Sequence, residues 1–360
     1  PLSFGCRLCY NDVMNRQPLI IRNAQAVTPH GVVTHATIVV DDGRIAAITT
    51  QPTDAPSSAR LLDAEGRLAL PGFIDMHVHG GRGFDVMDGT VDAVHGLARH
   101  LAEHGITGFL ATTVTASLDD TLAAADIVRQ ARVRPSPGAA ILGMHLEGPY
   151  INPMRRGAQA LEHIRPPSLA ELESVIAASG DCVRLVTLAP ELPAAHEMAA
   201  YLRRRGIVAS MGHSDATYEQ AVAAVDAGFS HVTHTYNAMR PFQHRDPSIA
   251  GVALSDPRVM AELIADGLHV HPGAARVLIQ ARGPQGVVLV SDAMRGAGLP
   301  YGCYRLGGHD VWTSENGART ASGNLAGSLL TLETALRNVL GWTGLPLHVA
   351  LAMTSLNQAR

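Results

Sequence analysis

From residue 68 onward, the chain alternates short apolar runs with longer amphipathic segments of helical period. Eight of these runs are predicted strands, and they span residues 68–79, 106–114, 140–147, 183–190, 207–213, 231–237, 261–265 and 287–292. Several of the helical segments stop at a glycine, a common signal at a helix C-terminus. Eight such repeats predict an α/β fold, a (β/α)8 barrel of the TIM type. The alternative, an open doubly wound sheet, needs a glycine-rich phosphate turn after its first strand, and Gly80-Gly81-Arg82-Gly83 lacks that spacing.

The residues before the barrel follow a different pattern. Residues 19–50 contain apolar runs separated by turns, one of them at Asp41-Asp42-Gly43, which predicts a small antiparallel β unit. We therefore expect an irregular extension at 1–17, a small β domain at 18–67 and the barrel domain at 68–360.

Composition limits the class of function. The chain has 360 residues, 46% of them hydrophobic, and a formal net charge of −4, which argues against a nucleic-acid or anionic-membrane surface. No apolar run has the length of a membrane span, and the four cysteines are too few and too scattered for a disulfide framework. We expect a cytoplasmic protein with a small-molecule partner and with no nucleic-acid or membrane partner.

Histidines and carboxylates gather at or just past the C-terminal ends of the predicted strands. These residues are His77, His79, Glu147, His213, His234 and Asp292. The strand ends of a barrel meet at one mouth, so these side chains are expected to converge. His77 and His79 project to the same side of their strand, and such a pair alone equally fits a solvated strand end, whereas the joint placement favours a site. His95, His100 and His104 lie in helical segments and are expected at the surface.

The residue types at this mouth suit metal-assisted hydrolysis of an amide or a related C–N bond. Four histidines and a carboxylate fit Zn²⁺ or Fe²⁺, as one ion with three protein ligands or as two ions that share Glu147. The sequence has no lysine, because all 28 basic residues are arginine, which excludes a Schiff base and a carbamylated-lysine bridge. A metal-activated water is then the expected nucleophile. Asp292 would act as general base and then as general acid, and His269 would polarise the carbonyl or hold the oxyanion.

The motifs around these residues resemble those of the amidohydrolase superfamily. They occupy residues 71–80, 146–149, 211–214, 233–239, 265–270, 290–293 and 324–328, and the likeness runs from about Leu19 to the end. The resemblance implies that Glu147, His213 and His234 bind the main metal. It further implies that His77 and His79 form the second-metal pair, which some members lack, and that Asp292 is the catalytic aspartate.

The resemblance also implies a substrate and a set of contacts to it. The expected reaction converts N-acetyl-D-glucosamine 6-phosphate to glucosamine 6-phosphate and acetate, in amino-sugar catabolism or cell-wall recycling. The galactosamine epimer, a related amidohydrolase reaction and a non-catalytic sugar-phosphate binder remain alternatives. The implied substrate-binding residues are Ala158, Gln159, Asn237, Ala238, Arg245, His269, Leu325, Ala326 and Gly327.

Among these, Asn237 and Ala238 would hold the sugar phosphate and His269 would contact the N-acetyl group. Arg245 would reach the phosphate bound by the neighbouring subunit of a homodimer, through a bidentate guanidinium contact. Gln159 stands where the family often has a histidine. Members of the family continue past the position of Arg360 with strands that pair with the N-terminal β unit, so the small β-sandwich domain is expected to be incomplete here.

Overall fold

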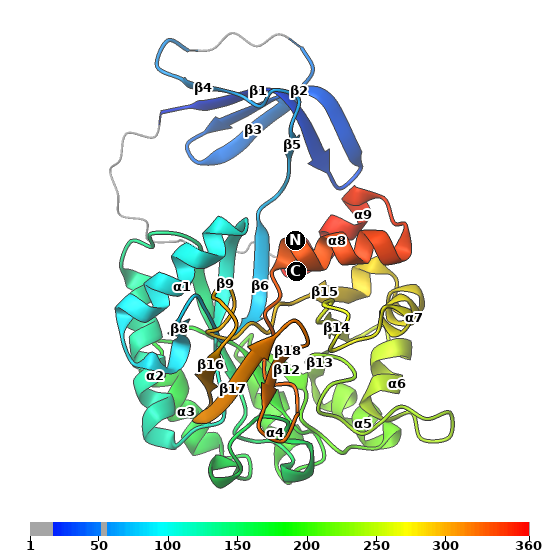
Figure 1. Cartoon of the computed structure of the whole chain (residues 1–360). Coiled ribbons are helices and arrows are strands. Elements are labelled where there is room, and N and C mark those ends of the chain that lie inside the picture. The colour runs from blue at the N-terminus through cyan, green and yellow to red at the C-terminus, as the bar shows by residue number, and fades with distance from the viewer. Residues whose placement is uncertain (1–16, 52–55, 360) are drawn as a thin grey trace. The chain divides into compact units, whose positions relative to one another are not determined.

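We describe a computed structural model that covers residues 17–51 and 56–359 (Figure 1). Residues 1–16 of the predicted N-terminal extension lie outside this part. Backbone contacts divide the chain into two compact units, which within the described part comprise residues up to 71 with 346–349, and residues 72–345 with 350–359. In the described part, no helix has both the length and the apolar character needed to cross a membrane.

The strands of the first unit form a single five-stranded sheet. Its strands are β1 (Leu19–Thr28), β2 (Gly31–Asp41), β3 (Arg44–Thr49), β4 (Arg60–Asp63) and β5 (Leu68–Ala69). They run in the order β3-β2-β1-β4, and β5 also pairs with β1. The predicted turn joins β2 to β3: Asp42 and Gly43 both have positive φ, 46° and 70°, as a two-residue hairpin of type I′ requires. At its other end the sheet extends past residue 67, because Leu68 and Ala69 pair with β1 and do not belong to the first barrel strand.

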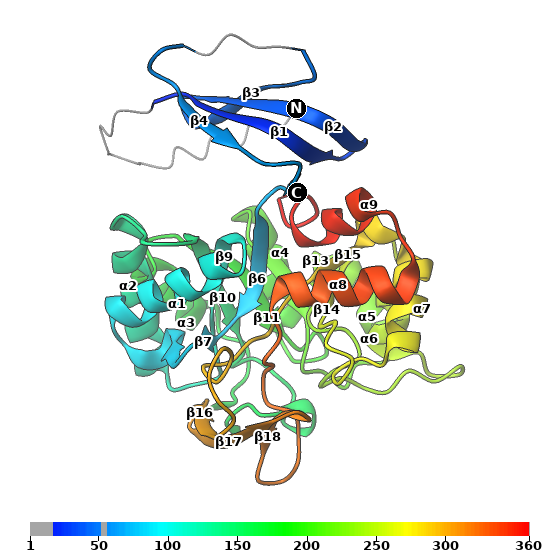
Figure 2. The same cartoon turned by 45° about the horizontal axis from the view of Figure 1, so that its top comes forward.

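The second unit is a nearly closed barrel of eight parallel strands with helices around it (Figures 1 and 2). The strands are β6 (Phe73–Val78), β9 (Ile106–Thr113), β10 (Ala140–Glu147), β11 (Val183–Leu188), β12 (Val208–Met211), β13 (Phe229–Val232), β14 (Met260–Leu263) and β15 (Val287–Leu289). The segment after β15 meets β6, where Asp292 N–H donates to the His77 carbonyl at 2.8 Å and His79 N–H donates to the Ala293 carbonyl at 2.9 Å. The predicted TIM-type barrel is confirmed.

Helices lie between the barrel strands and after the last of them. They are α1 (Val91–Glu103), α2 (Leu118–Val133), α3 (Leu169–Ala178), α4 (Ala195–Arg204), α5 (Tyr218–Ala227), α6 (Ser248–Ser255), α7 (Pro272–Arg282), α8 (Leu332–Thr343) and α9 (Leu347–Leu351). Helix α1 buries Val94, Leu97 and Leu101, and the Thr90 side chain caps its first turn. The prediction that His100 lies at the surface was wrong: its side chain is buried in the same face of α1.

A small antiparallel sheet follows the last barrel strand, and the sequence analysis did not predict it. It contains β16 (Cys303–Leu306), β17 (His309–Ser314) and β18 (Gly317–Thr320), and it lies at the end of the barrel where the strands terminate (Figure 2). Leu306 and Val311 pack with Val114 and Met294 in one apolar cluster. This cluster attaches the small sheet to the mouth of the barrel.

Candidate active site

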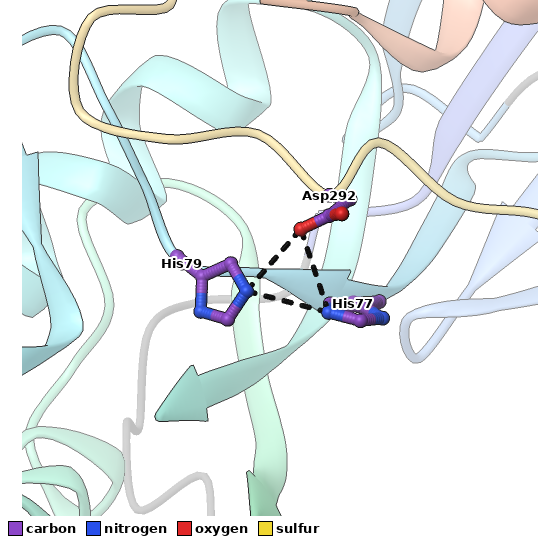
Figure 3. A group of neighbouring side chains, drawn as sticks. All are labelled: His77, His79 and Asp292. Carbon is purple, nitrogen blue, oxygen red and sulfur yellow. Dashed lines mark hydrogen bonds and ion pairs between the residues drawn. The ribbon is translucent and has the colours of Figure 1, made fainter. Parts of the chain in front are cut away.

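Two histidines from the first barrel strand and an aspartate that follows the last one meet at the barrel mouth (Figure 3). His77 lies near the end of β6, His79 comes just after it, and Asp292 follows β15. The Nε2 atoms of His77 and His79 are 3.3 Å apart. Asp292 Oδ1 lies 3.5 Å from His77 Nε2 and 3.2 Å from His79 Nε2. These three side chains form one buried group of possible metal ligands.

A second group forms beside the first from three other strands. Glu147 is the last residue of β10, and His213 and His234 come shortly after β12 and β13. Glu147 Oε1 lies 3.2 Å from the Nε2 atom of each histidine, and the two Nε2 atoms are 3.0 Å apart. All three side chains are buried. The six residues that the sequence placed at strand ends are therefore brought together.

Glu147 connects the two groups. Its Oε1 atom is 3.3 Å from His77 Nε2, in addition to its contacts with His213 and His234. Its other oxygen, Oε2, is 3.3 Å from His79 Nε2. One carboxylate thus faces four imidazole nitrogens, the arrangement that a bridging ligand between two ions requires.

Hydrogen bonds on the far side of the rings set the imidazole tautomers. The Nδ1 atoms of three of the histidines each lie against an oxygen acceptor: Glu262 Oε2 at 3.0 Å from His77, the Thr112 carbonyl at 3.2 Å from His79 and the Arg155 carbonyl at 3.0 Å from His213. Because these oxygens accept, each Nδ1 carries a proton, and a ring that gives up its second proton to a bound cation presents a lone pair on Nε2. The rings are therefore prepared as ligands.

The donor set fits a divalent cation. Ligand atoms about 2.1 Å from one ion in a tetrahedral arrangement lie about 3.4 Å from one another, and the separations of 3.0 and 3.2 Å around Glu147 Oε1 are close to this value. Neutral imidazoles whose Nε2 lone pairs point at each other repel unless a cation lies between them. Imidazole nitrogens with carboxylate oxygens are the ligands that zinc and similar metals prefer.

Backbone strain marks the same positions. His213, His234 and Asp292 have φ values of 48°, 30° and 48°, in the left-handed region that side chains with a Cβ disfavour. Such conformations cost of order 1–3 kcal/mol each and persist only where the surrounding structure imposes them. Each of these residues follows a strand end, where the turn directs its side chain into the mouth.

Both acidic groups of the centre are held in their ionised form. Burial raises the pKa of Glu147, but the charge of His77 and hydrogen bonds from His213 and His234 outweigh it, so the pKa lies well below its ordinary value. Burial likewise raises the pKa of Asp292, but the same His77 and the neighbouring His79 lower it on balance. Both carboxylates can therefore bind a cation at neutral pH, and Asp292 can accept a proton.

A cavity of about 230 Å³ opens above the two groups. Its lining includes His79, Glu147, His213, His234 and Asp292. Seven of the predicted substrate-binding residues also line it: Ala158, Gln159, Asn237, Ala238, His269, Leu325 and Gly327. Leu306 and Asn324, from the region of the β16–β18 sheet, complete part of the wall. The structure thus gathers most of the predicted contacts around one small-molecule site.

Two predicted substrate-binding residues lie elsewhere. Ala326 is buried, and its backbone N–H donates to the Ala318 carbonyl, so it packs beneath the cavity wall without lining it. Arg245 is exposed in the turn between Gln243 and Asp246 and does not line the cavity of its own chain. Within the described residues, its guanidinium has no hydrogen bond or ion pair.

His269 is held rigidly at the cavity wall by Asp266. Its Nδ1 atom lies 2.6 Å from Asp266 Oδ2, and its backbone N–H donates to Asp266 Oδ1 at 2.8 Å. Burial raises the pKa of Asp266, but these contacts with His269 lower it on balance. The aspartate therefore stays ionised and orients the imidazole.

Two features of the site were missed from the sequence. Glu262 lies fully buried on β14 and contacts His77 from inside the barrel. A charged residue within the apolar run 261–265 was the available signal, since a buried carboxylate needs a partner. The second feature is the contact of Gln159 with Glu147, which no local pattern indicates.

Comparison with known proteins identifies the family. The model of the amidohydrolase family matches residues 68–360. The chain is 40% identical over 342 residues to an N-acetylglucosamine-6-phosphate deacetylase of Lysinibacillus sphaericus. The aligned residues make up 95% of this chain and 88% of the relative. It is 41% identical over 341 residues to an N-acetylgalactosamine-6-phosphate deacetylase of Escherichia coli O157:H7, with 95% and 89% covered. The chain belongs to the amidohydrolase family.

Two solved structures of one relative have the same fold, and one of them carries a ligand. The N-acetyl-D-glucosamine-6-phosphate deacetylase of Mycobacterium smegmatis superposes with a TM-score of 0.87 at 34% identity, covering 96% of this chain and 90% of that one. A mutant of that enzyme, in complex with N-acetyl-D-glucosamine 6-phosphate, superposes with a TM-score of 0.86 and covers 96% of this chain and 89% of that one. Family membership and the buried ligand groups together support a site for a divalent metal.

Proposed function

We propose that this chain hydrolyses the N-acetyl group of N-acetyl-D-glucosamine 6-phosphate, giving glucosamine 6-phosphate and acetate. The observation that carries the proposal is the pair of buried ligand groups at the floor of a single cavity, with Asp292 beside them. The choice of substrate is supported by the names of the relatives and by the sugar phosphate bound in the mutant neighbour. We place the reaction in amino-sugar catabolism in the cytoplasm.

The proposed metal is Zn²⁺, with Fe²⁺ as the alternative. Glu147, His213 and His234 would hold one ion, and His77 and His79 would hold a second with Glu147 shared between them. A bound divalent metal supplies Lewis acidity and lowers the pKa of water to about 7. The Nε2 atoms and the ionised carboxylate described above suit both positions.

Asp292 is the proposed general base and then general acid. Its Oδ1 atom is 3.2 Å from His79 Nε2, and its side chain lines the cavity. The carboxylate would accept the proton of the attacking water and then donate it to the departing amine nitrogen. Its lowered pKa keeps it unprotonated before the attack, as the first of these steps needs.

His269, Asn237 and Ala238 are the proposed substrate contacts on the other wall. As an imidazolium paired with Asp266 on its Nδ1 side, His269 would donate from Nε2 to the acetyl carbonyl. Asn237 and the backbone at Ala238 would receive the sugar phosphate. Arg245 would complete the phosphate site of the neighbouring subunit in a homodimer, which agrees with its exposed position away from its own cavity.

The substitution Asp292→Asn tests the mechanism. We expect acetate release from N-acetyl-D-glucosamine 6-phosphate to fall by about two to four orders of magnitude, since the general base is lost. Metal bound by the Glu147 group, measured by elemental analysis, should stay at its wild-type level. Near-normal turnover by this variant would show that the assignment of Asp292 is wrong.

The galactosamine epimer is a second candidate substrate, because a relative at 41% identity is an N-acetylgalactosamine-6-phosphate deacetylase. The two sugars differ in the orientation of one hydroxyl group. Measuring kcat/KM for both 6-phosphates in parallel decides between them. A higher value for the galactosamine compound would replace the first proposal with the second.

A further inference from the structure

The side chain of Gln159 connects the Thr115 backbone to Glu147, the carboxylate that contacts both groups of possible metal ligands. Its Oε1 atom accepts the Thr115 backbone N–H at 2.7 Å, and its Nε2 atom donates to Glu147 Oε2 at 2.6 Å. The side chain is buried, with 7% of its surface exposed. Both the oxygen and the nitrogen of the amide therefore form hydrogen bonds within the protein.

These two contacts fix the direction of the amide. If the amide group rotated by half a turn, its NH₂ would face the Thr115 N–H and its oxygen would face the Glu147 carboxylate. Both contacts would then be repulsive, because two donors and two acceptors would be paired. The amide thus presents a donor to Glu147 in one orientation only.

The donor acts on the oxygen of Glu147 that faces His79. Oε2 lies 3.3 Å from His79 Nε2, while Oε1 faces His213 and His234 at 3.2 Å each and His77 at 3.3 Å. A carboxylate that turned about its last bond would give up one of these two sets. The hydrogen bond from Gln159 prevents that rotation without adding charge.

We propose that Gln159 is a positioning residue that holds the Glu147 carboxylate across both ligand groups, so that the site binds two divalent ions. This inference rests on the proposed function only where KM is compared, because metal binding is measured without substrate. Gln159 also lines the cavity, and its amide has a second N–H that could reach the substrate. A contact with substrate alone would change KM, whereas the positioning role changes metal binding, so the two can be separated.

The test is a metal titration of the whole chain with Gln159→Leu and with Gln159→Met. Each protein is stripped with a chelator and dialysed against a series of buffered free Zn²⁺ concentrations, and metal per chain is measured. We expect the wild type to bind two ions. In both variants the affinity for the second ion should fall by about 10- to 100-fold, while the affinity for the first changes little.

Gln159→His and Gln130→Leu serve as comparison variants. An imidazole can still donate to Glu147 in one of its tautomers, so Gln159→His should recover part of the second-ion affinity. Gln130 donates to Asp126 at 2.8 Å on the surface of α2, so Gln130→Leu removes a similar amide–carboxylate bond far from the site and should leave both ions in place.

The outcomes separate this inference from the proposed function. Wild-type affinity for two ions in Gln159→Leu or Gln159→Met, with only KM raised, would overturn the positioning role, and so would a wild type that binds a single ion. If one variant fails to fold, as judged by thermal unfolding, the other decides. A wild type that binds two ions but releases no acetate would refute the substrate and leave the role of Gln159 intact.

Discussion

Glu262 joins the two ligand groups from inside the barrel. It is fully buried, and its Oε2 atom lies 3.0 Å from His77 Nδ1 and also accepts the His234 backbone N–H at 3.0 Å. Burial raises its pKa, but the charge of His77 and the contact with His231 lower it on balance, well below its ordinary value. One acceptor oxygen therefore orients a side chain of the first group and the backbone of a residue in the second.

We predict that Glu262→Leu destabilises the protein and weakens metal binding. The substitution leaves two buried donors without an acceptor, at a cost of about 1–3 kcal/mol each in the free energy of unfolding. Glu262→Gln keeps an acceptor oxygen and should lose less of both properties. Urea unfolding and metal analysis check the prediction, which equal losses in the two variants would contradict.

At the scale of elements, strand β10 carries Glu147 and depends on a close approach to β11. A Cβ at Gly143 would lie 2.4 Å from the Cys182 carbonyl oxygen, and the register of β10 against β9 shifts next to this residue. We predict that Gly143→Ala lowers the free energy of unfolding by about 1–3 kcal/mol, because the strands must separate. The metal content should fall as well, since Glu147 ends the strand.

Gly341 in helix α8 is the matched control. No atom lies within 4 Å of a Cβ built at this position, and its backbone is helical. Gly341→Ala should raise the free energy of unfolding by about 0.5–1 kcal/mol, because alanine loses less backbone entropy than glycine in a helix. Chemical unfolding of both variants gives the comparison, and a stabilising Gly143→Ala would refute the account of the β10–β11 contact.

Helix α1 carries a buried histidine that should make stability depend on pH. Burial lowers the pKa of His100, as does the nearby His104, while Glu103 and Glu333 oppose the shift and Arg82 supports it. A group whose folded pKa is lowered contributes stability above its unfolded pKa of about 6.5, and this contribution is lost as the pH falls through the folded value. We therefore predict that the contribution of His100 to stability is lost on acidification below pH 6.5.

The variant His100→Asn isolates this contribution. The slope of stability against pH for one proton is at most about 1.4 kcal/mol per pH unit. Between pH 7 and pH 5 the stability of the wild type should fall relative to that of His100→Asn, as measured by urea unfolding at each pH. Parallel curves for the two proteins would show that His100 does not titrate on unfolding.

The sequence predicts the barrel and the convergence of six polar residues at its mouth, for a physical reason. Strand and helix periods are local, and polar residues such as Glu147 or His213 stand out at the end of an apolar run. The β16–β18 sheet escapes the same approach, because its short, partly exposed strands carry no clear period. The contacts of Gln159 with Glu147 and of Glu262 with His77 depend on tertiary geometry, since the second pair is 185 residues apart.

At the scale of the whole molecule, the chain brings residues from five barrel strands to one centre but leaves Arg245 outside it. Its exposed guanidinium is free of hydrogen bonds and ion pairs within residues 17–51 and 56–359, and a bidentate guanidinium is well suited to a phosphate. If two copies form a symmetric dimer, the same surface of each would serve the other. The proposed homodimer would then complete each phosphate site from the neighbouring subunit.

Mixing two inactive variants tests this arrangement. Arg245→Ala lacks the phosphate contact and Asp292→Asn lacks the general base, so each alone should show low activity at limiting substrate. In a mixed dimer, the site of the Arg245→Ala chain keeps its own Asp292 and receives the intact Arg245 of the other chain. After refolding in equal amounts, random pairing should restore about one quarter of wild-type activity. If Arg245 served its own chain, neither site of the mixed dimer would be complete and mixing would restore nothing.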